Sequence, residues 1–187
     1  KLPGALADYH FAPTSTSKAN LLRENVPADR IVVTGNTVID ALKTTVRPDY
    51  RFDDDNLHSV LESGKRLILM TTHRRENLGE PMRHVYKALC EVLRTHRDVE
   101  AIFPVHKNPK VRQIVNEELG HLPQVHLIEP LDYQPFANLM ARVDIVLTDS
   151  GGIQEEAPAL GKPVLVLRDT TERPEAVSAG TVKLIGT

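Results

Sequence analysis

Short apolar runs alternate along the chain with longer stretches that have a helical repeat. Most of the runs are continuously apolar, as expected for strands covered on both faces of a sheet. They predict seven strands, at residues 9–12, 31–34, 67–71, 101–105, 125–128, 145–148 and 164–167. The stretches between them predict five helices, at residues 16–25, 81–97, 109–119, 135–142 and 152–160. This alternation predicts an α/β fold with a doubly wound parallel sheet.

The longest predicted helix has one apolar face. Val85, Leu89 and Val92 fall on the same side of it, and Pro81 stands in its first turn, where a proline breaks no internal hydrogen bond. We expect this face to be the buried one.

The stretch at residues 44–59 interrupts the pattern. It is polar and contains a proline, and we interpret it as a linker or a surface excursion. Its acidic run Asp53–Asp55 is interpreted as a solvated charge run. The residues before it then belong to a neighbouring domain, and those after it form a nearly complete α/β domain.

Composition narrows the class of protein. The chain has 187 residues, 41% of them hydrophobic, and a net charge of -2, which argues against a nucleic-acid binder that acts through bulk electrostatics. The single cysteine, Cys90, can form no internal disulfide and fits a reducing compartment. No apolar run is long enough to span a bilayer, and the first residues do not resemble a signal peptide. We expect a cytoplasmic protein, and the missing initiator Met suggests a fragment.

Candidate chemistry gathers at the ends of the predicted strands, where open parallel sheets bind their ligands. Gly151 and Gly152 follow one strand and precede a helix, so the backbone can turn sharply there and approach a phosphate or diphosphate. Glu156 lies on the same helix face as Gly152 and could accept hydrogen bonds from ribose hydroxyls, whereas Glu155 points elsewhere. The alternative is a plain tight turn followed by glutamates that suit the helix dipole.

A second strand end carries the cationic motif "THRREN". His73, Arg74 and Arg75 would together neutralise an anion, although an arginine could instead pair with Glu76. We favour the anion site.

Other strand ends supply weaker candidates. Arg173 is either a bidentate phosphate clamp or a surface arginine. Phe136 and Tyr133 are packing aromatics unless one borders a base, and His106 is as much a structural histidine as a functional one. The histidines and the cysteine show no spacing typical of metal ligands, so we predict no metal site.

Four motifs together resemble the non-hydrolysing UDP-N-acetylglucosamine 2-epimerases. They are "VVTGNTVIDAL", "THRREN", "PVHKNP" and "LTDSGGIQEEAPALGKPVLVLRDTTERPEA", and the resemblance extends through essentially the whole chain. It implies the GT-B architecture, in which two Rossmann-like domains face each other across a cleft. Residues 1–46 would be the end of the N-terminal domain with the interdomain segment. Residues 47–187 would be the C-terminal, UDP-binding domain without its last helices.

The resemblance also implies an activity. Family members interconvert UDP-GlcNAc and UDP-ManNAc by eliminating UDP to a glycal and adding it back, without a cofactor. The implied partners are a UDP-sugar and, at full length, a second copy in a homodimer, with neither nucleic acid nor membrane. The catalytic carboxylates would lie outside this chain, so we expect the chain alone to be inactive.

The resemblance assigns roles residue by residue. Ser150, Gly151 and Gly152 match the diphosphate-binding turn, and Glu156 matches the ribose-binding acid. Arg173 and His73 match diphosphate contacts, and His73 is also implicated in catalysis. Phe136 matches a residue beside the uracil. Arg74 and His106 match positions at an allosteric UDP-GlcNAc site.

Three alternatives share parts of this pattern. A GT-B glycosyltransferase would keep the glycine turn and the ribose-binding acid but would use an acceptor, and it has no need of "THRREN". A UDP-sugar-binding module would bind without chemistry. A hydrolysing epimerase would let water trap the intermediate.

Overall fold

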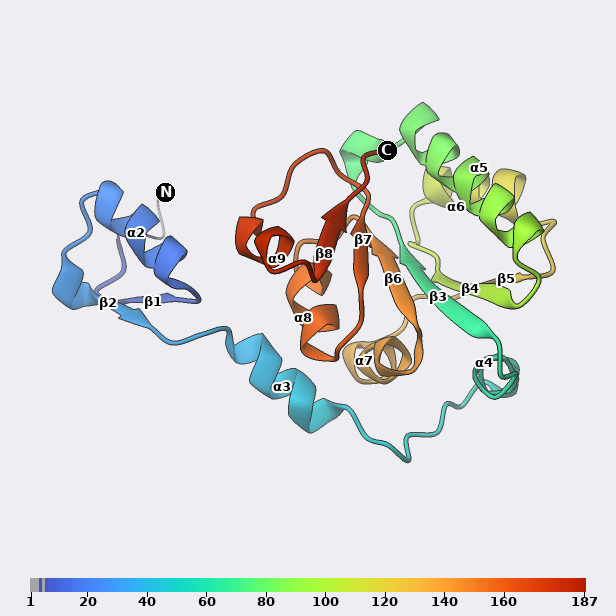
Figure 1. The fold of residues 1–187 in the computed structure, drawn as a ribbon, viewed down its shortest axis with the longest axis horizontal. Coiled ribbons are helices and arrows are strands. Elements are labelled where there is room, and N and C mark those ends of the chain that lie inside the picture. Colours follow the sequence, from blue (N-terminus) through green and yellow to red (C-terminus); the bar gives the residue numbers. More distant parts are fainter. Residues whose placement is uncertain (1–3, 5) are drawn as a thin grey trace. The chain divides into compact units, whose positions relative to one another are not determined.

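The computed structural model describes residue 4 and residues 6–187, except for the side chain of Arg75 (Figure 1). The chain divides into two compact units, Lys1–Thr44 and Thr45–Thr187. No helix in the described part of the chain is long and apolar enough to cross a membrane.

The first unit is built on a pair of short parallel strands. Strand β1 (His10–Ala12) pairs in parallel with β2 (Ile31–Val33). Helix α2 (Ser15–Arg23) connects them and is capped by the Thr14 hydroxyl, which accepts from the Ser17 N–H. The connection also contains the 3-10 helix η1 (Ala28–Arg30), and helix α3 (Thr37–Thr45) follows β2. The sequence pattern predicted both strands and α2 but not α3.

The second unit is a doubly wound sheet of six parallel strands in the order β5-β4-β3-β6-β7-β8. The strands are β3 (Arg66–Thr71), β4 (Val99–Pro104), β5 (Val125–Ile128), β6 (Ile145–Thr148), β7 (Val164–Val166) and β8 (Val182–Leu184). The main helices are α5 (Glu80–Thr95), α6 (Pro109–Leu119), α7 (Tyr133–Arg142) and α8 (Ile153–Ala159). Helices α5 and α6 lie on one side of the sheet, and α7 and α8 lie on the other (Figure 1). The predicted Rossmann-like fold class is confirmed.

Strand order reverses between β3 and β6. The chain winds outward from β3 through β4 to β5, then crosses back and places β6 on the other side of β3. In open α/β sheets this reversal separates the loops at the carboxyl ends of the two central strands and opens a crevice for a ligand. The segments after β3 and β6 are therefore where a site is expected.

The buried face of α5 agrees with the predicted one at Leu89 but not at Val92. Met82, Tyr86 and Leu93 pack into the core, whereas the Val92 side chain is 44% exposed. The prediction was wrong for Val92 because the helix is rotated toward its Met82–Tyr86–Leu93 stripe. Leu89 is buried in the core as predicted, and Val85, Leu89 and Val92 also line an apolar groove beside β3, β6 and β7.

The polar stretch at residues 44–59 is not a simple linker. Asn138 of α7 accepts a hydrogen bond from the Arg47 N–H (2.8 Å), and the Arg142 guanidinium donates to the Tyr50 carbonyl (2.5 Å). Asp54 begins helix α4 (Asp55–Leu61), accepting from the N–H groups of the second and third residues after it. Asp53, Asp54 and Asp55 are all exposed, as expected for a solvated charge run, and Asp54 is in addition an N-cap.

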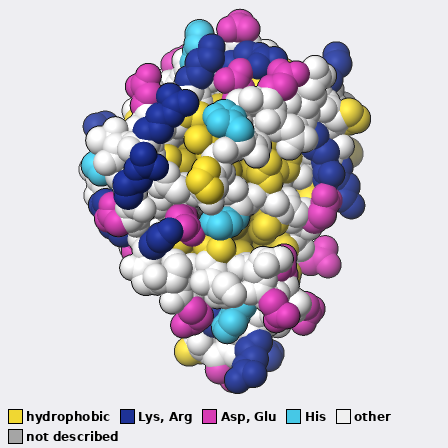
Figure 2. Space-filling view, turned by 90° about the vertical axis from the view of Figure 1, so that its right-hand side faces the viewer, with side chains coloured by type: hydrophobic (Ala, Val, Ile, Leu, Met, Phe, Trp, Pro, Cys, Tyr) yellow, Lys and Arg dark blue, Asp and Glu magenta, His cyan; other side chains and the backbone are white. Residues whose placement is uncertain are grey.

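Two further elements were missed near the end of the chain, the five-residue helix α9 (Pro174–Ser178) and strand β8. Both are too short to show a period. On the side of α4, α5 and α6, charges of both signs are interspersed with apolar surface (Figure 2).

Neighbouring residues of α5 provide a test of this core. Leu93 is fully buried, so Leu93→Ala should lower the free energy of unfolding by about 2–5 kcal/mol by leaving a cavity. Val92→Ala should change it by less than about 1 kcal/mol because Val92 is 44% exposed and its truncation leaves no closed cavity. Urea denaturation followed by circular dichroism measures both, and equal losses would contradict the helix orientation.

Candidate functional site

The site begins where β3 and β6 end side by side. Thr71 pairs with Thr148 at the last position of both strands, and their hydroxyl oxygens lie 2.6 Å apart. "HRREN" follows the first strand and "DSGG" follows the second. The two strongest motifs of the sequence therefore leave the sheet from adjacent strands.

Asp149 joins the two motifs. Its side chain is completely buried, and Oδ2 accepts hydrogen bonds from the N–H groups of His73 (3.0 Å) and Arg74 (2.9 Å) and from Asn77 Nδ2 (3.4 Å). Burial alone would raise the pKa of Asp149. The adjacent His73 side chain and the bonds from the two backbone N–H groups outweigh burial and hold that pKa below its ordinary value. Sequence reasoning missed Asp149 and Asn77, although an acid directly after an apolar strand was a visible signal.

His73 lies against this carboxylate and beside a second histidine. Its Nδ1 is 3.1 Å from Asp149 Oδ1, and its side chain is 46% exposed. The Asp149 carboxylate raises the pKa of His73, while burial and the charge of Arg74 oppose that rise. The ring of His106 is stacked on that of His73, with centroids 6.2 Å apart. The structure therefore brings together two of the predicted residues.

Arg74 is bound to the protein on two sides. Its Nε donates to the Asp149 carbonyl (3.0 Å), and its Nη1 donates to Glu76 Oε1 (3.0 Å). The alternative that one arginine of the motif pairs with Glu76 is confirmed for Arg74. In this arrangement Arg74 supports the turn that carries His73.

Ser150, Gly151 and Gly152 form the turn after β6. The Ser150 N–H donates to Thr148 Oγ1 (3.0 Å). Neither glycine has a positive φ; Gly152 lies at φ -67° and ψ -42°, which any residue adopts. The predicted turn is present, but its backbone requires a positive φ at neither glycine.

A need for open space above Gly151 and Gly152 could still explain why neither position carries a side chain. A Cβ on Gly151 would meet Glu172 Oε2 at 3.9 Å, and one on Gly152 would meet Glu156 Oε1 at 3.4 Å. Both neighbours are the tips of flexible side chains. Nothing in the described protein therefore forces glycine here, and close approach of a ligand stays a prediction.

Gln154 ties the glycine turn to the loop after β7. This fully buried side chain donates from Nε2 to the Ser150 carbonyl (3.0 Å) and accepts at Oε1 from the Thr171 hydroxyl (2.5 Å). Thr171 Oγ1 in turn accepts from the Arg173 N–H (3.0 Å). Gln154 thus holds the Arg173 loop beside the start of α8, a role that its sequence position did not indicate.

The arginines on this loop are paired with carboxylates. Arg173 binds Glu155 through Nε, and Arg168 forms a two-point ion pair with Glu172 (2.8 and 2.9 Å). The Arg168 guanidinium, assisted by a backbone N–H, lowers the pKa of Glu172 to about 2. Arg173 therefore reaches the start of α8 and is engaged with the protein there.

Glu156 differs from these glutamates. It is half-buried, and its carboxylate forms no hydrogen bond or ion pair with the described residues, although its backbone N–H donates to the Gly152 carbonyl (3.1 Å). Burial, with a contribution from the charge of Glu155, raises the pKa of Glu156. Tyr133 lies on the first turn of α7. Burial raises its pKa, and the negative charge of Glu156 adds to that rise. Phe136 lies one turn further along α7 and is half-buried, at the same end of that helix.

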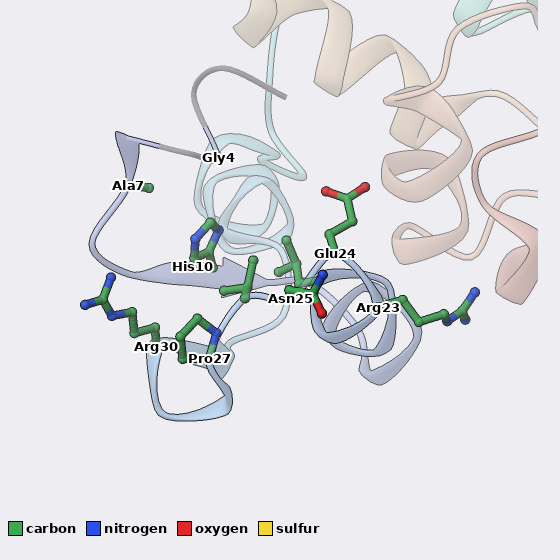
Figure 3. A pocket seen from close by; sticks show the side chains of 10 residues that line it. Gly4, Ala7, His10, Arg23, Glu24, Asn25, Pro27 and Arg30 are labelled. Atoms are coloured by element: carbon green, nitrogen blue, oxygen red, sulfur yellow. The ribbon is translucent and has the colours of Figure 1, made fainter.

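A separate hollow of about 890 Å³ lies in the first unit (Figure 3). His10 and Arg30 stand at one side of it, and Arg23 and Glu24 point away from them. It contains none of the predicted site residues. Among the described residues, no group of three or more His, Cys, Asp or Glu side chains could hold a metal ion.

Comparison with known proteins gives a consistent match. The family described as "UDP-N-acetylglucosamine 2-epimerase" matches residues 1–187. The UDP-N-acetylglucosamine 2-epimerase of Bacillus subtilis (strain 168) is 56% identical over 189 residues, covering 100% of this chain and 48% of the relative. The chain thus spans about half the length of the curated relatives it matches.

Solved structures similar to this chain give the same match as the sequence comparison. The S. aureus MnaA–UDP structure superposes with a TM-score of 0.93 at 49% identity, covering 100% of this chain and 50% of the other. The UDP-GlcNAc 2-epimerase from Neisseria meningitidis bound to UDP-GlcNAc gives a TM-score of 0.87 at 48% identity, covering 99% and 51%.

The pairing of Arg168 with Glu172 predicts a pH response. The carboxyl of Glu172 should titrate near pH 2, so the pair contributes stability above the unfolded pKa of about 4.3 and loses it as pH falls through 2. Arg168→Gln should return the midpoint to about 4. Carboxyl ¹³C NMR measures the titration midpoint of Glu172. Arg112→Gln is the control, because it removes an ion pair remote from Glu172. An unchanged midpoint in Arg168→Gln would contradict the pairing.

Proposed function

The chain belongs to the UDP-N-acetylglucosamine 2-epimerase family, and we propose that it supplies the UDP-binding half of an enzyme that interconverts UDP-GlcNAc and UDP-ManNAc. Elimination would break the bond between sugar carbon 1 and the diphosphate oxygen, and UDP would leave with the electron pair. A base would take the proton from carbon 2, leaving a glycal. Protonation of carbon 2 on the opposite face and re-addition of UDP would complete the epimerisation.

The observation that carries this proposal is the state of Glu156. A half-buried carboxylate without a protein partner is costly unless donors reach it. The two hydroxyls of a ribose are suitable donors, since an ionised carboxylate can accept from both. Glu156 lies next to Gly152, so a ribose bound to it would bring its diphosphate over the glycine turn.

The diphosphate would find cationic groups on the neighbouring loops. His73 has a raised pKa, so a larger fraction of it is protonated near neutrality than of an ordinary histidine. Arg173 is two residues beyond Thr171 and is held beside α8 through Gln154. It would have to exchange Glu155 for phosphate. Both groups would stabilise the negative charge that builds on UDP as it leaves.

The remaining roles follow from family membership. We propose Phe136 beside the uracil, Ser150 with Gly151 and Gly152 at the diphosphate, and Arg74 and His106 at a second, regulatory UDP-GlcNAc site. Residues 1–46 would complete an N-terminal domain, and the whole protein would be a cytoplasmic homodimer. The groups that move the proton at carbon 2 would come from outside this chain.

Binding of UDP to the 187-residue chain tests the role of Glu156. Glu156→Gln keeps the shape but loses the charge and one acceptor, so the Kd for UDP should rise by about tenfold or more. Glu91→Gln, at an exposed position of α5, should leave the Kd unchanged. Isothermal titration calorimetry measures the Kd for UDP of the unsubstituted chain and of the two variants. Equal Kd values for Glu156→Gln and the unsubstituted chain would contradict a ribose at Glu156.

Turnover tests the role of His73 and requires a protein of the relatives' full length that carries this sequence. UDP-GlcNAc in deuterated water should gain deuterium at carbon 2, as followed by NMR. His73→Gln should slow this by roughly 100-fold or more, because the departing diphosphate loses a charged donor. Unchanged turnover in His73→Gln would contradict that role. UDP binding without any deuterium uptake would indicate a binding module instead of an epimerase.

A further inference from the structure

The two oxygens of the buried Asp149 carboxylate have different surroundings. Oδ2 accepts from two backbone N–H groups and from Asn77, which is enough to hold the turn after β3 in place. Oδ1 is equally buried, and among the described residues it has no well-aligned hydrogen bond. The nearest donor to it is Nδ1 of His73, at 3.1 Å.

This second oxygen is not explained by the turn alone. A carboxylate that only capped the turn would be satisfied through Oδ2, and an amide could replace it. A buried carboxylate oxygen left without a donor is costly. A small rotation of the His73 ring brings an Nδ1–H onto Oδ1 and removes that cost, so the carboxylate and the ring are matched to each other.

Among the side chains that the structure describes, the other charged groups near His73 do not compete for Nδ1. Arg74 is held by the Asp149 carbonyl and by Glu76, and Glu76 faces Arg74. On the loop after β4, His106 accepts the Asn108 N–H at its own Nδ1 (3.1 Å), so a neutral His106 carries its proton on Nε2. Its ring is stacked on His73 at an interplanar angle of 22° and so presents a face, not a donor.

We propose that Asp149 is a positioning residue for His73: it keeps a proton on Nδ1, fixes the direction of the ring and leaves Nε2 directed away from the carboxylate, toward the ligand. This inference rests on the proposed function for the identity of that ligand, a UDP-sugar diphosphate. With Nδ1–H held by Asp149, Nε2 of the charged ring donates to a phosphate oxygen, and Nε2 of the neutral ring accepts a proton.

An isosteric substitution separates this role from capping. In Asp149→Asn, the amide oxygen must take the place of Oδ2, because three N–H donors point there. The amide NH₂ then faces His73 Nδ1 and donates to it, so a neutral His73 must carry its proton on Nε2. The substitution should therefore reverse the tautomer and lower the pKa of His73.

The tautomer is measured by ¹⁵N NMR of histidine-labelled 187-residue chain above the pKa of His73. We expect Nδ1–H in the unsubstituted protein and Nε2–H in Asp149→Asn. Asn77→Ser is the control, since it weakens the same turn but leaves Oδ1 untouched, and it should keep Nδ1–H. Nε2–H in the unsubstituted protein would overturn the proposal even if Asp149→Asn failed to fold. Nδ1–H in folded Asp149→Asn would also overturn the proposal.

Kinetics of the full-length protein extend the test. Asp149→Asn should lower kcat by roughly 100-fold with little change in KM, and it should move the pH profile toward acid. A KM effect alone would overturn the positioning role. The tautomer needs no substrate, so Nδ1–H in a chain that does not bind UDP would contradict the proposed function alone. UDP binding with Nε2–H would contradict only the role of Asp149.

Discussion

The parallel pairing of β3 with β6 is the constraint on which the rest of the site depends. Strand order reverses at this pair, which in open α/β sheets is where the loops after two neighbouring strands separate and a ligand binds. Asp149 bonds from the end of β6 to the loop after β3. Because this acid is fully buried, the geometry of His73 is set by the core of the sheet and not by a solvated loop.

Charge in the site is largely balanced within the protein. Arg74, Arg168 and Arg173 are each paired with a glutamate, while Glu156 is the half-buried carboxylate that forms no such pair among the described residues. An incoming diphosphate would therefore act by exchanging partners. A ribose would meet a carboxylate that lacks donors. Under the proposed function, the arginines would be available to a phosphate when it binds. Until then their pairing with glutamates would avoid the cost of unpaired positive charge.

Much of the second unit could be predicted from the sequence because buried parallel strands are continuously apolar. Residues 125–128, 145–148 and 109–119 agree with β5, β6 and α6 residue for residue. The short elements α9 and β8 gave no period, and the N-cap role of Asp54 was masked by two flanking aspartates. Asp149, Asn77 and Gln154 were missed because their importance comes from partners far along the chain, which a local pattern cannot reveal.

The central proposal is that a nucleotide diphosphate binds over Gly151 and Gly152. The most direct measurement is the change in backbone amide NMR shifts when UDP is added to the ¹⁵N-labelled chain. The account predicts the largest changes at Ser150–Gly152, His73 and Glu156. Changes centred instead on the hollow around His10 and Arg30, or spread evenly along the chain, would contradict it.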